Sequence, residues 1–119
     1  MNDLAQERCV ACRKDSPLVT EAELAELKPQ IPDWSIVERD GIPRLERSYR
    51  VKDFVQAVAF ANKLADLAEA EDHHPSILIE YGKVVVAWWT HAIRGLHRND
   101  FVMAAKTDQL AAELATPAS

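Results

Sequence analysis

The sequence predicts an α+β fold, a two-layer sandwich in which a four-stranded antiparallel sheet carries three helices on one face. Segments with helical and strand-like periodicity follow one another in the order α-β-β-α-β-β-α. Both pairs of strand-like segments are joined by short turns that contain glycine, which is typical of antiparallel hairpins. Hairpins with helices before, between and after them favour an antiparallel sheet whose helices gather on one face.

Length, composition and charge limit the class of protein. The 119 residues fit one domain, which we expect over residues 20–116, with residues 1–19 as an N-terminal arm. No apolar run approaches the ~20 residues of a membrane span, and the N-terminus lacks the apolar core of a secretory signal. We therefore expect a cytoplasmic protein without membrane contact. A net charge of -5, without a basic patch, argues against nucleic acid as a ligand.

Local signals predict the first helix and the first hairpin. Thr20 and Glu23 form the T-x-x-E capping box of a short helix, which Pro29 and Pro32 end. The following stretch "DWSIVERDGIPRLERSYRV" reads as two strands that turn at "RDG".

The two longer helices differ in how much of their surface is apolar. Asp53 suits the N-cap of a helix over residues 54–71, whose apolar residues cover more than one narrow stripe. Such a helix is expected to be buried on two sides, by the sheet and by either a partner subunit or a larger intrachain core. Asn99 is expected to cap the last helix, residues 100–115. Its inner face would hold Phe101, Val102, Ala105, Leu110 and Leu114.

The second hairpin allows a prediction of its register. If Gly82 and Lys83 form a two-residue type II′ turn, Tyr81 opposes Val84. Alternation then places Ile77, Ile79, Tyr81, Val84, Val86 and Trp88 on the core face, and Leu78, Val85, Ala87 and Trp89 on the other. The second face is too apolar for free exposure, so a subunit, the arm or a flat aromatic ligand should cover part of it. The same register sets His74 opposite His91.

Three of the four histidines thus fall at one end of this hairpin, although ordinary surface residues at a helix end are the simpler alternative. His73 follows the long helix, and Glu69 is its expected i, i+4 partner. Asp100 opens the last helix after a loop that leaves from His91. We therefore expect Glu69, His73, His74, His91 and Asp100 to line one cleft, whereas His97 is read as a surface residue.

Imidazoles beside carboxylates suit proton transfer near neutral pH. The sequence has no nucleophile elbow, no P-loop and no dinucleotide fingerprint. A metal site built from His74, His91 and a carboxylate is the alternative, but His73 and His74, on opposite sides of an extended backbone, would chelate one metal poorly. The C-x-x-C pair, Cys9 and Cys12, lies on the arm and is read as reduced and incidental, with a metal clip or a redox role as alternatives.

The spacing E-x3-H-H-P-x5-Y-x9-H-x8-D resembles that of the pterin-4a-carbinolamine dehydratase family. It is met by Glu69, His73, His74, Pro75, Tyr81, His91 and Asp100. The stretches "YGKVVVAWWTH" and "GLHRNDFVMAA" add to a resemblance, particularly to bacterial members, that covers about residues 16 to 115. The N-terminal C-x-x-C lies outside it.

The resemblance implies a hydro-lyase that converts 4a-hydroxytetrahydrobiopterin to quinonoid dihydropterin and so recycles the cofactor of aromatic amino acid hydroxylases. It implies catalysis by His73, His74 and His91, with Glu69, Asp100 and Trp89 as substrate-binding residues. No metal and no further cofactor are implied, since the pterin is the substrate. Members form homodimers or homotetramers, and bacterial ones accompany phenylalanine hydroxylase. The alternative is an interaction or dimerisation module with little or no catalytic role.

Overall fold

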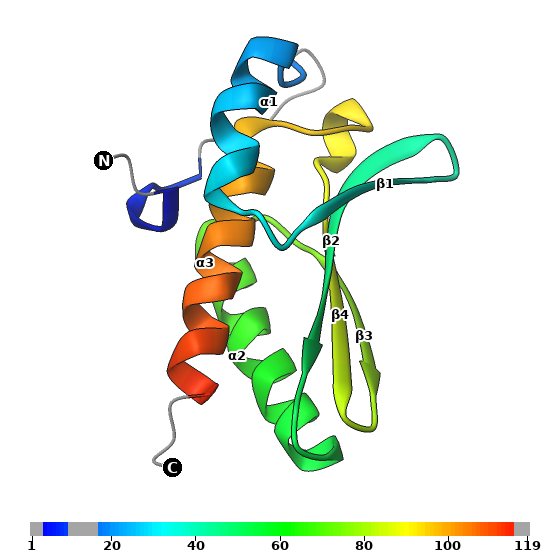
Figure 1. Ribbon diagram of the computed structural model, residues 1–119, viewed down its shortest axis with the longest axis vertical. Coiled ribbons are helices and arrows are strands. Elements are labelled where there is room, and N and C mark those ends of the chain that lie inside the picture. Colours follow the sequence, from blue (N-terminus) through cyan, green and yellow to red (C-terminus); the bar gives the residue numbers. More distant parts are fainter. Residues whose placement is uncertain (1–3, 10–16, 116–119) are drawn as a thin grey trace.

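The computed structural model describes residues 4–9 and 17–115 and confirms the α+β prediction. Its helices are α1 (Glu21–Leu27), α2 (Phe54–Glu71) and α3 (Arg98–Ala115), and its strands are β1 (Ser35–Arg39), β2 (Ile42–Arg50), β3 (Ser76–Glu80) and β4 (Lys83–Trp88). Three short 3-10 turns are η1 (Leu4–Gln6), η2 (Lys28–Gln30) and η3 (His91–Ile93). Figure 1 shows α2 and α3 side by side against one face of the sheet, with α1 at one end of this layer.

The sheet is antiparallel throughout, with the strand order β1-β2-β4-β3. The two hairpins therefore meet through β2 and β4. The first hairpin turns at Asp40 and Gly41, whose φ angles of 54° and 78° are both positive, as a type I′ turn requires. The predicted "RDG" turn is confirmed.

The predicted start signals of α1 and α2 are confirmed. Thr20 Oγ1 accepts a hydrogen bond from Glu23 N at 3.1 Å, and Glu23 Oε1 accepts one from Thr20 N at 2.9 Å, which completes the capping box. Asp53 accepts a hydrogen bond from Gln56 N at 2.9 Å. Each side chain satisfies backbone donors that lack a partner at a helix start.

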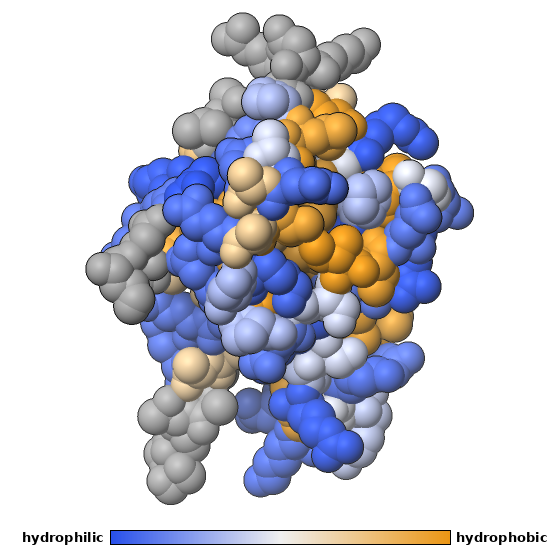
Figure 2. Space-filling model, turned by 45° about the horizontal axis from the view of Figure 1, so that its top comes forward, coloured by the Kyte–Doolittle hydropathy of each residue, from blue (hydrophilic) through white to orange (hydrophobic). Residues whose placement is uncertain are grey.

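The core lies between the sheet and the helix layer. Its largest fully buried side chains include Trp34, Leu45, Leu64, Val84, Val86, Trp88, Phe101 and Val102. The surface is not uniformly polar, and the face seen in Figure 2 has an apolar patch bordered by hydrophilic residues. Val55, at 72% exposure, and Leu78, at 52%, are among the large apolar residues left exposed.

Within the described chain, α2 is buried on one side. Its buried stripe consists of Ala57, Phe60, Ala61, Leu64 and Ala68. Val55 lies on the opposite side by helical periodicity and is exposed. The alternative of a larger intrachain core on the second side is therefore wrong, and the partner-subunit alternative stays a prediction.

The predicted turn of the second hairpin is wrong. The turn is formed by Tyr81 and Gly82, so that Glu80 pairs with Lys83 and Ile79 with Val84. Gly82 has a φ of 76°, and its carbonyl accepts a hydrogen bond from Val51 N at 3.1 Å, which ties the turn to the end of β2. Because the pairing shifts by two residues, both faces keep their predicted members except Tyr81, which stands in the turn at 77% exposure.

Candidate active site

Asp100, in the first turn of α3, is the centre of the site and is fully buried. Its Oδ1 lies 2.7 Å from His73 Nε2. Its Oδ2 accepts hydrogen bonds from Thr90 Oγ1 at 2.8 Å and from His97 N at 2.9 Å. Three donors from three segments thus compensate the burial of the carboxylate and bring those segments together.

His73 is held beside Asp100 by contacts of both its backbone and its ring. Asp72 ends α2 in the left-handed region, with φ of 52° and ψ of 44°, and His73 N donates to Ala68 O at 3.1 Å. The imidazole is 8% exposed and stacks on the indole of Trp88, with ring centroids 5.7 Å apart and planes at 9°. When Nε2–H donates to Asp100, Nδ1 keeps the lone pair, so the carboxylate fixes one tautomer of the ring.

His74 faces solvent and pairs with Glu69. Its Nε2 lies 2.7 Å from Glu69 Oε2, with side-chain exposures of 53% and 77%. The predicted pairing of Glu69 with His73 is therefore wrong. The left-handed turn at Asp72 directs His73 inward and leaves His74, five residues after Glu69, as its partner.

His91 begins η3, and its exposed ring lies against Trp89, with centroids 4.5 Å apart. The predicted opposition of His74 and His91 is wrong, because the β3–β4 ladder ends at Ser76 and Ala87 and its register is shifted. The two histidines nevertheless belong to segments that Asp100 joins. His74 follows His73 and His91 follows Thr90, and both of those bind the carboxylate.

Trp89 is half-buried on the predicted second face of the sheet and has a partner that the sequence did not indicate. The guanidinium carbon of Arg44 lies 4.0 Å from the centroid of its ring. Arg44 Nε is buried and has no hydrogen-bond partner among the residues described. The pairing of β2 with β4 explains this contact, since Arg44 and Trp89 extend the Leu45–Trp88 pair by one step.

His97, read as a surface residue, is half-buried and structural. Its Nδ1 accepts a hydrogen bond from Asn99 N at 3.0 Å, while Asp100 Oδ2 accepts one from His97 N. The reciprocal bonds resemble a capping box, so His97 rather than Asn99 caps α3. Burial is the main cause that lowers the pKa of His97, while the charge of Asp100 acts in the opposite direction.

Within the described residues the histidines form no metal site, and a groove found elsewhere on the molecule does not include them. In residues 4–9 and 17–115, no group of three His, Cys, Asp or Glu side chains is arranged to hold a metal ion. Cys9 is half-buried, with its Sγ 4.0 Å from Asn99 O, and Cys12 lies outside the described residues. A groove of about 1130 Å³, lined by residues such as Gln56, Lys83 and Asp108, lies at the other end of the helix layer and includes none of the predicted site residues.

The buried His73–Asp100 pair thus joins the end of α2 to the start of α3, with the exposed His74–Glu69 pair next to His73 in the chain and a third imidazole, His91, beside the indole of Trp89. Such a set can donate and accept protons at a substrate held against the surface. No described helix combines the length and the apolar character that a membrane crossing needs.

The chain is similar to known proteins over most of its length. Residues 17–110 match the family described as Pterin 4 alpha carbinolamine dehydratase. A Gloeobacter violaceus protein named "Putative pterin-4-alpha-carbinolamine dehydratase 1" is 61% identical over 112 residues, which cover 94% of this chain and 97% of that protein.

Two solved structures have the same fold. A transcriptional coactivator/pterin dehydratase from Brucella melitensis matches with a TM-score of 0.70 and 34% identity, over 80% of this chain and 99% of that one. A pterin dehydratase-like protein identified as a RuBisCO assembly factor in the alpha-carboxysome matches with a TM-score of 0.54 and 27% identity, over 65% and 89% of the two chains. The fold, the extent of the match and the identity together show that this chain belongs to the pterin 4 alpha carbinolamine dehydratase family.

Proposed function

We propose that this protein is a hydro-lyase that dehydrates 4a-hydroxytetrahydrobiopterin, the pterin-4a-carbinolamine, to quinonoid dihydropterin. The carbon–oxygen bond at C4a breaks, the hydroxyl leaves as water with an added proton, and N5 loses its proton. The observation that supports the proposal most is the buried His73–Asp100 pair beside the exposed His74–Glu69 pair. These pairs supply acid and base groups of different environment, so the reaction needs neither a metal nor a cofactor in this proposal.

His74 is the acid in this scheme because it is exposed and can reach a bound hydroxyl, with Glu69 holding its ring. His73 and His91 position the pterin and act as base, and Asp100 orients His73. Trp89, beside His91, offers a flat surface on which the pterin ring can stack.

The direct test is the dehydration rate of synthetic 4a-hydroxytetrahydropterin. Loss of a general acid or base lowers kcat by about 10²- to 10⁴-fold, which we expect for His74→Ala and His91→Ala. Lys83→Gln, in an exposed ion pair at the far end of the hairpin, is the control and should keep wild-type activity. Near wild-type rates in both histidine variants would refute the proposal. Activity that is lost after chelator treatment would refute its metal-independent form.

A second role, as an interaction module, is favoured by the exposed apolar residues Val55 and Leu78. We propose that these surfaces are used in a homodimer or homotetramer of this cytoplasmic protein, with phenylalanine hydroxylase as a further partner. Light scattering that shows only a 13.4 kDa species would refute self-association. An inactive His74→Ala variant that keeps the oligomer would separate the two roles.

A further inference from the structure

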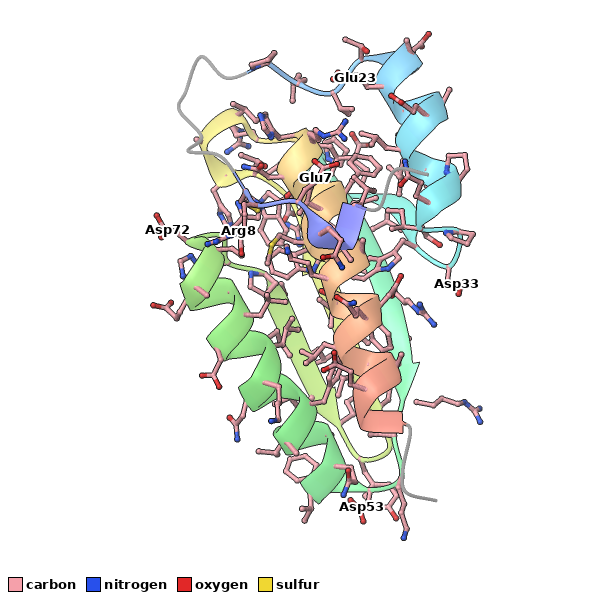
Figure 3. All side chains as sticks on the ribbon, turned by 90° about the vertical axis from the view of Figure 1, so that its left-hand side faces the viewer. Glu7, Arg8, Glu23, Asp33, Asp53 and Asp72 are labelled. Carbon is pink, nitrogen blue, oxygen red and sulfur yellow. The ribbon has the colours of Figure 1, made fainter. Side chains whose placement is uncertain are left out.

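Residues 4–9, one described segment of the N-terminal arm, lie against the two helix ends that carry the site. Figure 3 shows Glu7 beside α3 and Arg8 beside the end of α2, close to Asp72. Leu4 is 1% exposed and belongs to the core, and Lys106 Nζ donates to Ala5 O at 2.8 Å. Residues 4–9 are thus packed against the domain.

Glu7 binds the start of α3. Its two carboxylate oxygens accept hydrogen bonds from Arg98, the first residue of that helix, at 3.0 Å from Nε and 2.7 Å from the terminal nitrogen. The fork-like geometry is the strong form of such a pair. The hydrogen bond from Arg98 is the main cause that lowers the pKa of Glu7. Arg98 lies two residues before Asp100.

Arg8 and Cys9 bind the end of α2. Glu71, the last residue of that helix, is a carboxylate whose side chain is 7% exposed. Its Oε2 lies 2.8 Å from Arg8 Nε, and its Oε1 accepts from Cys9 N at 2.9 Å. Glu71 lies two residues before His73.

Consecutive residues of the arm therefore hold two helix ends whose closeness the His73–Asp100 pair requires. The Cα atoms of Glu7 and Arg8 are ~3.8 Å apart across a trans peptide, so the two contacts cannot separate far. We propose that Glu7, Arg8 and Glu71 are positioning residues that keep His73 Nε2 within 2.7 Å of Asp100 Oδ1. The consequence for catalysis rests on the proposed function, whereas the effect on the imidazole does not.

The contacts of Glu7, Arg8 and Glu71 are called the clamp below. Glu7→Gln tests it, because this variant keeps the shape of the side chain and removes the charge. Glu46→Gln is the matched control, since Glu46 forms a comparable ion pair of 3.0 Å with Arg39 on the first hairpin. The NMR signal of the proton on His73 Nε2 reports the hydrogen bond to Asp100. We expect this signal to shift, and its proton to exchange faster with water, in Glu7→Gln but not in Glu46→Gln. Misplacement of a catalytic group should lower kcat by about three- to tenfold while KM stays within about twofold.

An unchanged His73 signal in Glu7→Gln would overturn the clamp, whatever the activity. If the His73 signal changes in Glu7→Gln but the wild-type protein has no dehydratase activity, the clamp is supported and the proposed function is overturned. If Glu7→Gln fails to fold, Arg8→Gln, at a side chain that is 73% exposed, provides the same reading from the other helix end.

Discussion

Replacement of Asp100 by asparagine tests the centre of the site with a change of one atom type. The carboxylate accepts from His73, Thr90 and His97, and an amide has only one acceptor oxygen. Oxygen toward Thr90 and His97 places the amide NH₂ against His73. In the reverse orientation the amide NH₂ faces the backbone N–H of His97. Because both groups are donors, the orientation with the oxygen toward Thr90 and His97 is favoured.

In that first orientation His73 Nε2 must accept a hydrogen bond, so its proton moves to Nδ1 and the ring takes the opposite tautomer. Loss of tautomer control at a catalytic histidine lowers kcat by up to ~10⁴-fold, and we expect a decrease of at least about 10²-fold. Loss of one hydrogen bond to a buried charge should also lower the free energy of unfolding by about 1.5–3 kcal/mol.

Activity at 25 °C and urea denaturation measure the two effects separately. Glu69→Gln is the comparison, because it alters an equally short contact, to His74, at the surface. Exposed pairs contribute little, so its free energy of unfolding should change by less than about 1 kcal/mol. An Asp100→Asn variant with kcat within threefold of wild type would refute the role of Asp100 in orienting His73.

Three further predictions concern single side chains. His97→Asn should make the melting temperature less sensitive to acid: the folded pKa of His97 is lowered below its unfolded value of 6.5, so its stabilisation is complete above pH 6.5 and is lost as pH falls toward the folded pKa. Equal slopes in both proteins between pH 7 and 5 would contradict this. Arg44→Met should keep the packing on Trp89, remove a buried donor without a partner, and leave the free energy of unfolding unchanged or up to ~1 kcal/mol higher in urea titrations. A clear loss would mean that Arg44 Nε is hydrogen-bonded in solution. Tyr49→Phe should cost about 1 kcal/mol by the same measurement, because it removes one hydrogen bond to Asp108 and leaves those from Trp34 and Arg47; no loss would contradict that bond.

Features encoded by neighbouring residues could be predicted from the sequence. The capping box of Thr20 with Glu23 and the Asp40–Gly41 turn depend on local geometry, and both are confirmed. The prediction of the second turn is wrong because a positive φ at Gly82 suits both the predicted Gly82–Lys83 turn and the observed Tyr81–Gly82 turn. In the observed register, the carbonyl of Gly82 accepts a hydrogen bond from Val51 N. Val51 lies outside this hairpin, so the hairpin's own sequence does not indicate the bond.

Partners set by tertiary contacts could not be predicted in the same way. The contact of His73 with Asp100 lies at the predicted end of the hairpin, but the predicted partners of Glu69 and His74 are wrong, and the common cleft of the three histidines stays a prediction. Sequence spacing favours Glu69 with His73, whereas the left-handed residue Asp72 changes the direction of the chain. The contact of Arg44 with Trp89 depends on which strands are neighbours in the sheet, and no local signal gives that order.

The left-handed conformation of Asp72 has a consequence for how this region tolerates change. It buries the imidazole of His73 and leaves that of His74 exposed, although the two histidines are neighbours in the chain. Their surroundings are therefore set by their distance in residues from Asp72, so a single residue inserted before His73 would take the buried position beside Asp100 and move His73 to the exposed one. Insertions and deletions between α2 and β3 should therefore be tolerated less well than substitutions of the surrounding side chains.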